Sequence, residues 1–285
     1  MQVGNINFPG RTNIRGDVLD NFDIYSQKGI VIAGAVGSCH LISDGDITVG
    51  SMSGNNDGLI RCNGNLKANY LNGATIECMG SVTVSNEIRN CIIKSADTIM
   101  VKNGVISGGE CIALNGIEAK DIGATAGVIT KLQSGVYFPE TDRLQLLKTQ
   151  QKSISIQKQF IQRSLGSLDI KKVKNSSVAE ALQKRLEILT ERLEILEELG
   201  EKVKQELNDF VFEDYENNAK INVHRRLKEK VIISLETITE EIRFEHSGPL
   251  SVVADVPNGM LRFCEMTPLS IQAEDAEWEE EEQTI

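Results

Sequence analysis

Six cysteines, three histidines and two acidic clusters are the residues of this sequence best suited to chemistry. Cysteine and histidine bind zinc when they occur in closely spaced pairs, and grouped carboxylates bind calcium. The sequence has no CxxC pair and no HExxH motif. Cys39 with His40 could ligate a metal, and DGD (44–46) or NND (55–57) could hold calcium. We favour ordinary loop and turn roles for all of them, since turns require Asp, Asn and Gly. We therefore expect no metal or cofactor.

Motifs for nucleotide binding and for nucleophilic catalysis are absent as well. The sequence contains no GxxxxGK[ST] or GxGxxG loop to hold phosphates, and no GxSxG around a serine nucleophile. Aromatic residues, which stack on sugars in many glycan-binding proteins, make up only 5%. We expect no catalytic residues and a protein that is not an enzyme.

The net charge of −11 arises mostly at the end of the chain. Seven of the 41 acidic residues lie between Glu274 and Glu282, which leaves 34 acidic against 30 basic residues elsewhere. No basic stripe suited to nucleic acid remains, and no apolar run reaches the roughly 18 residues of a membrane span. We predict a cytoplasmic protein without membrane insertion, nucleic-acid partner or signal peptide, and a disordered acidic tail at 271–285.

A repeat with strand periodicity fills the first half of the chain. Gly45, Gly64 and Gly80 each lie at the centre of a unit in which alternate residues are apolar or small. Alternation is the strand pattern, and strand units repeated without intervening helices predict a β-solenoid, whose coils bury apolar side chains by stacking. We expect three more centres, a partial first unit, a bulging loop at 51–58 and a second apolar side. The further centres are Lys28, Asp97 and Gly109, so that consecutive centres are 17, 19, 16, 17 and 12 residues apart. The partial first unit contains Gly4, Ile6 and Phe8. The second apolar side contains Val18, Val36, Leu71 and Ile88.

The repeat also gives the cysteines a structural interpretation. The column two residues before each centre holds only small residues: Ser26, Ser43, Cys62, Cys78, Ser95 and Ser107. Cys111 falls in an apolar column. A column shared by serine and cysteine indicates buried packing residues rather than ligands, and reduced thiols suit a cytoplasmic protein.

The pattern becomes helical between 139 and 212. The first stretch, from about Glu140 to Leu168, has an apolar seam, and a second stretch follows a break at 169–177. In the second stretch apolar residues alternate at spacings of four and three, which is typical of a coiled coil. Two such helices predict a long antiparallel coiled-coil hairpin. Its seam is the candidate interaction site: Leu182, Leu186, Leu189, Leu193, Leu196, Val203 and Leu207. Apolar residues outside the seam, at Ile188, Ile195 and Leu199, indicate a third helix or self-association.

Strand-like pairs of apolar residues return after the helices, between 213 and 270. The pairs are Ile221 and Val223, Val231 and Ile233, Ile242 and Phe244, Leu250 and Val252, and Leu261 and Phe263. The sequence therefore predicts a mainly β protein with an α insertion. It has a β-helix at 1–138, the hairpin at 139–212, and strands at 213–270 that complete or cap the β-helix, because an open last coil would be prone to aggregation.

The order of these parts resembles the flagellar assembly protein A family. The resemblance rests on GNINFPG and IRGDVLDNF near the start, on repeats such as SDGDITVG and CNGNLKAN, on the long coiled coil, and on NAKINV. It implies a right-handed β-helix with an inserted coiled coil, in a bacterial cytoplasmic protein linked to flagellar assembly and polar organisation. It also implies the glucose-specific phosphocarrier of the sugar phosphotransferase system as a partner. Family members usually carry a domain before the solenoid, so we expect a shortened homologue or a fragment.

The leading functional hypothesis is a non-enzymatic scaffold, with a rigid solenoid and a hairpin that binds a protein partner or a second copy of the chain. The alternative is a carbohydrate-binding, carbohydrate-active or other ligand-binding β-helix that uses its outer strand face.

Overall fold

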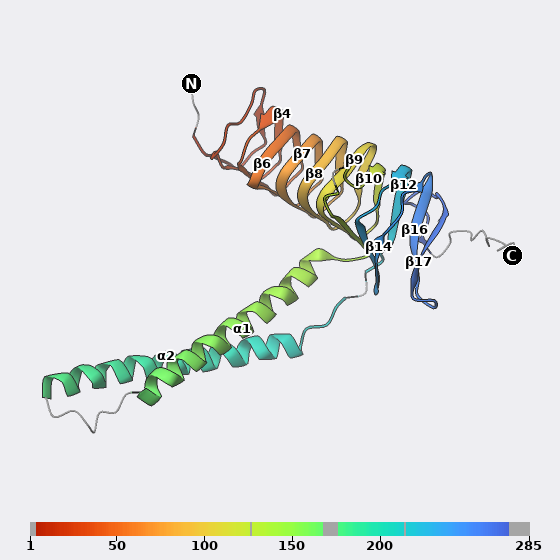
Figure 1. Cartoon of the computed structure of the whole chain (residues 1–285). Helices are drawn as coiled ribbons and strands as arrows, with labels where there is room; N and C mark the ends of the chain where they lie inside the picture. Colours follow the sequence, from red (N-terminus) through yellow and green to blue (C-terminus); the bar gives the residue numbers. More distant parts are fainter. Residues whose placement is uncertain (1–3, 126, 168–175, 214, 274–285) are drawn as a thin grey trace. The chain divides into compact units, whose positions relative to one another are not determined.

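The computed structural model describes residues 4–125, 127–167, 176–213 and 215–273 (Figure 1). The described chain forms two compact units. One unit combines the residues up to 138 with those from 215 onward, and the other contains 139–214.

The first unit is a β-solenoid of stacked coils, seen side by side in Figure 1. Strands of each coil pair in parallel with strands of the next, as in β5 with β6, β6 with β7 and β7 with β8. Its coils are built from β1 (Ile6–Phe8), β2 (Thr12–Ile14), β3 (Ile24–Ser26), β4 (Ile30–Val36), β5 (His40–Ser43), β6 (Ile47–Cys62), β7 (Leu66–Cys78), β8 (Val82–Ser95), β9 (Ile99–Ala113), β10 (Ile117–Ile122) and β11 (Thr130–Ser134).

The core consists of columns of aliphatic side chains that run through the coils. The strand register stacks one such column through seven coils, and each of its members is fully buried: Ile30, Ile47, Leu66, Val82, Ile99, Ile117 and Ile221. A single coil cannot bury such a face alone, so each coil is stabilised by its neighbours. The second apolar side is also confirmed, with Met52 as a further member between Val36 and Leu71.

The small-residue column is confirmed from Ser26 to Ser95. Its side chains reach the backbone at the corner of the coil: the Ser26 hydroxyl lies within hydrogen-bonding distance of two carbonyls, Gly10 O at 2.6 Å and Gly29 O at 2.8 Å. The Ser95 hydroxyl donates to Gly80 O at 2.8 Å. Between Ser26 and Ser95 the column therefore holds small side chains that can hydrogen-bond to the corner backbone.

The register corrects three details of the predicted repeat. Ser95 lies opposite Ala113, so the sixth centre is Asn115 and not Gly109, and Ser107 lies outside the small-residue column. Gly109 belongs to another corner, where its φ of +80° suits glycine and where a Cβ would lie 2.1 Å from Cys91 O.

The other two corrections concern the first unit and the loop. Ile6 and Phe8 belong to a first unit as predicted, and because they lie opposite Ile24 and Ser26 the centre of that unit is Gly10. The predicted loop at 51–58 is too wide, because only 54–57 leave the register of β6 with β7. Within that bulge Asn55 and Asn56 take positive φ, a conformation that asparagine adopts more readily than most residues.

The second unit contains two long helices, α1 (Phe138–Ser167) and α2 (Ser176–Asn208). Salt bridges join Arg143 to Glu206 and Lys158 to Glu197, each at 3.7 Å. Ile154 packs against Gly200: a Cβ added at Gly200 would lie 3.5 Å from Ile154 Cγ2. The predicted seam residue Leu168 and most of the predicted break lie outside the described residues. Helix α2 ends at Asn208, one residue after the last predicted seam residue, Leu207.

The chain returns to the solenoid at β12 (Lys220–Leu227), which pairs in parallel with β10, and at β13 (Val231–Leu235), which pairs in parallel with β11. Antiparallel strands follow: β14 (Ile238–Ile242), β15 (His246–Ser247), β16 (Leu250–Asp255) and β17 (Met260–Glu265). They pair with β12, β13 and each other, so that the last coil does not present an open edge. Phe244 lies beyond β14 and is 77% exposed, contrary to the strand predicted there.

Two segments that are far apart in the sequence meet where the helices are inserted. The Ser134 hydroxyl donates to Asn218 O at 3.1 Å, and the rings of Tyr137 and Tyr215 lie 4.3 Å apart. The insertion thus interrupts a coil, which begins with β11 and continues with β12.

A closing segment, residues 267–273, lies against β12. The fully buried Lys220 ammonium donates to Thr267 Oγ1, Pro268 O and Ile271 O at 3.0, 2.8 and 2.6 Å. Asn218 and Asn222 also donate to backbone carbonyls of this segment, and Ala273 N donates to Asn218 Oδ1. Bonded structure therefore continues past 271, the predicted start of the acidic tail; residues 274–285 lie outside the described residues.

Candidate functional site

The predicted interaction residues lie on the less exposed side of α2. Leu196 is buried at 7% exposure, and the other six are half-buried. On α1, Leu147 and Ile161 are buried as well, at 5% and 4%. These side chains are thus largely covered within the helical unit, where they stabilise it.

Both helices also carry large apolar side chains that are exposed. Leu146 near the start of α1 is 56% exposed, and five others lie closer to the middle of the helices. We call these five the outer apolar patch: Ile156 (58% exposed), Phe160 (71%), Ile188 (63%), Ile195 (51%) and Leu199 (44%). The sequence pattern singled out the three α2 residues but missed Phe160 and Ile156. Their signal is present in the sequence as an i, i+4 apolar pair that falls outside the α1 seam.

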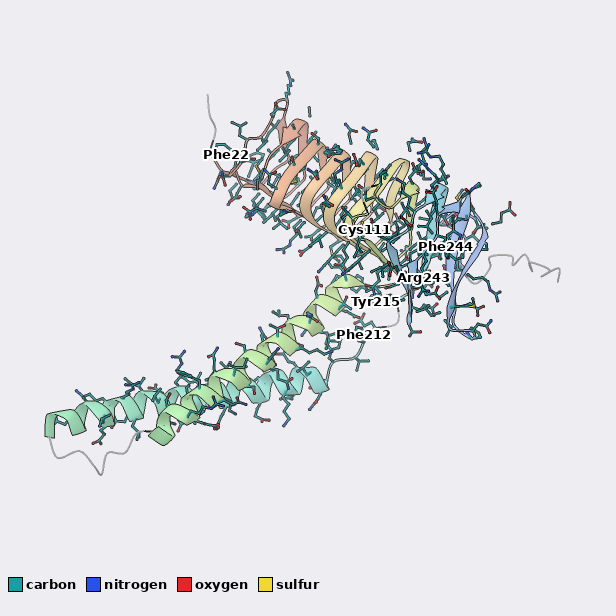
Figure 2. All side chains as sticks on the ribbon, viewed as in Figure 1. Phe22, Cys111, Phe212, Tyr215, Arg243 and Phe244 are labelled. Carbon is teal, nitrogen blue, oxygen red and sulfur yellow. The ribbon has the colours of Figure 1, made fainter. Side chains whose placement is uncertain are left out.

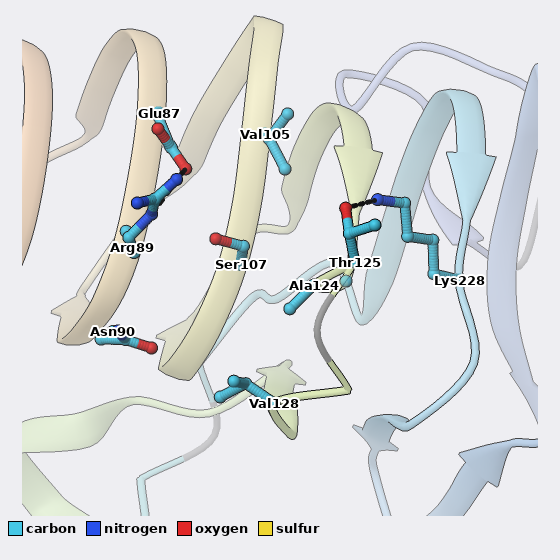
Figure 3. Close-up of a pocket in the computed structure, with 10 residues that line it drawn as sticks. Glu87, Arg89, Asn90, Val105, Ser107, Ala124, Thr125, Val128 and Lys228 are labelled. Atoms are coloured by element: carbon cyan, nitrogen blue, oxygen red, sulfur yellow. Dashed lines mark hydrogen bonds and ion pairs between the residues drawn. The ribbon is translucent and has the colours of Figure 1, made fainter.

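A pocket of about 430 Å³ lies on the wall of the solenoid (Figure 3). It is lined by residues of β8 and β9, by Gly123, Ala124, Thr125 and Val128, and by Lys228. The Arg89 guanidinium binds Glu87 Oε1 at 2.8 Å, and the Lys228 ammonium donates to Thr125 Oγ1 at 3.0 Å. Val105 and Val128 supply the apolar part of the lining.

The chemistry that this pocket can supply is binding rather than acid–base catalysis. Glycoside hydrolysis requires two carboxyl groups facing the scissile bond, whereas Glu87 is the single carboxylate among the lining residues and is paired with Arg89. The lining also contains no aromatic ring on which a sugar could stack. A small polar or anionic molecule would suit the two cations.

The cysteines lie inside the solenoid or its closing strands, as Figure 2 shows for Cys111, and all six are buried and free. Burial raises the pKa of the Cys111, Cys91 and Cys39 thiols. Cys62 and Cys78 lie 3.4 Å apart, and the hydrogen bond between them and burial raise the pKa of Cys62. Because the thiolate is the reactive form, these four thiols, whose pKa is raised, are poor nucleophiles and poor ligands. The hydrogen bond from Cys62 lowers the pKa of Cys78. Among the described residues no group of three or more His, Cys, Asp or Glu side chains could hold a metal ion.

A charged cluster joins β12 to β10 beside the insertion point. Arg225 Nε donates to Asp121 Oδ1 at 2.9 Å and Nη2 binds Oδ2, while His224 Nε2 lies 2.9 Å from Glu118 Oε1. The hydrogen bond from Arg225 lowers the pKa of Asp121. The members are more than 100 residues apart, so no spacing in the sequence could reveal them. This cluster holds the chain where it re-enters the solenoid.

The closing strands carry an exposed aromatic group. The His246 ring stacks on Phe263 with centroids 4.3 Å apart, and a pocket of about 420 Å³ is lined by β14 residues, Arg243, Phe244 and these two rings. Figure 2 shows Phe244 and Arg243 on this part of the molecule. Phe244 was predicted as a strand residue, and its exposure had no sequence signal.

Within the described part of the chain, neither helix combines the length and the low polarity that a bilayer span would need.

Comparisons with known proteins agree with the fold. No curated protein and no solved structure gave a match to the chain. The family model described as the Flagellar Assembly Protein A beta solenoid domain matches residues 1–256, which include the first strand region, the helices and the returning strands up to β16. The chain therefore belongs to the flagellar assembly protein A family, and the matched residues form the β-solenoid domain of that family.

Proposed function

We propose that this protein is a non-enzymatic scaffold in flagellar assembly, located in the cytoplasm and concentrated at a cell pole. The solenoid, taken as a right-handed coil by family resemblance, serves as a rigid body. The single observation that carries the proposal is the group of large apolar side chains that the helical unit leaves exposed. Monomeric proteins rarely expose apolar groups in clusters unless a partner covers them.

We further propose that α1 and α2 form an antiparallel coiled-coil hairpin, which is the docking arm of the scaffold. Three contacts support this arrangement: Arg143 with Glu206, Ile154 with Gly200, and Lys158 with Glu197. Along these contacts the residue number rises on α1 as it falls on α2. The alternating seam on α2 supplies the apolar spacing that such a pair requires.

The partner proposed for the scaffold is the glucose-specific phosphocarrier of the sugar phosphotransferase system, which follows from the family resemblance. Binding should be measured by calorimetry between the purified phosphocarrier and the full chain, alongside a variant in which 140–212 is replaced by a short Gly/Ser linker. We expect the full chain to bind and the shortened chain to fail. Equal affinity for both chains would exclude the hairpin as the docking arm, and no binding by either would exclude this partner.

The pocket in Figure 3 favours a second candidate function, the binding of a small polar ligand on the solenoid wall. The expected ligand is an anion or an acidic sugar, held by Arg89 and Lys228. A thermal-shift screen of such compounds would support this function if a stabilising compound lost its effect in Lys228→Ala. A screen without any such compound would leave the scaffold as the better account.

A further inference from the structure

The two lateral sides of the proposed hairpin differ in polarity. In heptad notation the α1 seam residues Ile154 and Ile161 occupy position d, and Leu196 occupies position d of α2. Phe160, Ile188 and Ile195 then all fall at position c, and Leu199 falls at position g. Positions c and g of both helices lie on the same side of an antiparallel pair, so these four residues share one side. Ile156, the fifth residue of the patch, falls at position f, at the margin of that side.

The opposite side, formed by positions b and e, is polar throughout its central part. On α1 it presents Lys152, Gln159 and Gln162, and on α2 it presents Glu187, Glu194 and Glu201. A hairpin that faced only water would have no reason to concentrate its exposed apolar residues on one side. The outer apolar patch is therefore a surface that another chain covers.

The charges of the two helices indicate what covers it. Helix α1 contains five basic and two acidic residues, a net charge of +3, and α2 contains five basic and eight acidic residues, a net charge of −3. A second hairpin, turned about a two-fold axis parallel to the helices, would place its acidic α2 against the basic α1 of the first. Every helix of the resulting bundle would then have only oppositely charged neighbours.

We propose that two copies of this chain associate through their outer apolar patches and form an antiparallel four-helix bundle. The proposal rests on the hairpin of the proposed function and adds its geometry and its partner. Because Lys158 is level with Glu197 and Ile154 with Gly200, Phe160 is level with Ile195 and Arg163 with Glu191. In the bundle, Phe160 packs against Ile195 and Leu199 of the second copy, and Arg163 faces Glu191 of the second copy.

The size of this contact is sufficient for a stable dimer. The paired part of the hairpin, from about 143 to 165, is roughly 34 Å long at 1.5 Å per residue, and two helices side by side are about 20 Å wide. One face therefore offers on the order of 700 Å², or about 1,400 Å² for both copies, within the range of specific protein interfaces.

The test measures the mass of the full chain by sedimentation equilibrium at concentrations from about 1 to 100 μM, with circular dichroism to verify the helices. We expect a dimer, and a loss of affinity of about 100-fold in the double variant Phe160→Gln with Ile195→Gln, since both side chains are central and apolar. The matched control, Gln159→Ala with Glu194→Gln, changes the adjacent polar side and should leave the dimer intact. A monomeric full chain at 100 μM, or an unchanged mass in the double variant with intact helices, would overturn the proposal.

Charge reversal gives a second readout that does not depend on apolar packing. Arg163→Glu and Glu191→Arg should each weaken the dimer by about 5-fold, and the two changes together should restore it. No restoration would reject the two-fold axis proposed above. Failure of this dimer is distinguishable from failure of the proposed function, because phosphocarrier binding is measured separately in the Phe160→Gln, Ile195→Gln variant.

Discussion

Lys220 offers a sharp test of how the closing segment is held. Its ammonium is fully buried and donates three hydrogen bonds, to Thr267 Oγ1, Pro268 O and Ile271 O. The substitution Lys220→Met retains the length and apolar contacts of the side chain but removes all three donors. Any loss should therefore concentrate in residues 267–273 and spare the parallel coils.

The magnitude follows from two opposing effects. A hydrogen bond from a charged donor contributes about 1.5–3 kcal/mol, so three bonds amount to about 4.5–9 kcal/mol. Burying an ammonium costs several kcal/mol, and methionine recovers that cost. Pro268 O and Ile271 O each keep one other donor, from Ile271 N and Asn218 Nδ2. We expect the closing segment to lose about 2–4 kcal/mol.

Hydrogen exchange of individual amides is the assay, because it reports local opening separately from global unfolding. A loss of 2–4 kcal/mol corresponds to a fall of about 30- to 1,000-fold in protection at Thr267, Ile271 and Ala273. The control is Lys131→Met, an exposed lysine on β11, which should change nothing in this segment. Unchanged protection at the three amides, or an equal fall across β10 and β12, would refute the reasoning.

Three further predictions follow from the solenoid and its junctions. Asp121→Asn should cost about 2 kcal/mol in urea unfolding at pH 7, since it leaves the half-exposed Arg225 without its partner. Because Arg225 lowers the pKa of Asp121, this contribution to the stability of the native protein is present above about pH 4 and is lost as the pH falls through the folded pKa. In urea titrations, the difference in unfolding free energy between the variant and the native protein should therefore be smaller at pH 3 than at pH 7. Gly109→Ala should destabilise the protein by about 3 kcal/mol in thermal unfolding, because the φ of Gly109 is +80° and the added Cβ would overlap Cys91 O. In contrast, Gly166→Ala on the exposed surface of α1 should stabilise that helix by about 0.5–1 kcal/mol. Cys62→Ser should be tolerated, because the column of Cys62 contains serines. Cys111→Ser, at a fully buried apolar position, should lower the free energy of unfolding by about 2 kcal/mol. Equal melting temperatures for the two variants would contradict the column assignment.

The sequence predicted the coils because stacked strands repeat the same alternation in every unit. Its errors arose where glycine serves two purposes. Gly109 lies at a corner and was mistaken for a unit centre, although the resulting spacing of 12 residues departed from the others. The heptad pattern likewise predicted the seam on α2, because a/d spacing is local information.

The parts that could not be predicted depend on contacts between distant residues. Nothing local distinguishes Asp121 and Arg225 from surface charges, since their pairing is created by the return of β12 beside β10. Lys220 reads as a polar residue in a strand, and only the closing segment explains its burial. Phe160 was missed for a related reason, because its partner in the proposed bundle belongs to a second copy.

The interrupted coil has a consequence for biosynthesis. The contact between Ser134 and Asn218 spans 84 residues, so the coil that begins with β11 stays incomplete until the ribosome has produced both helices. At roughly 5–20 residues per second this takes about 4–17 s. The earlier coils can stack on one another during that time, while β10 and β11 expose strand edges that β12 and β13 later cover. Helices form within about a microsecond, so the rate of translation, and not the rate of helix formation, sets how long the nascent chain displays these edges to its neighbours on the polysome.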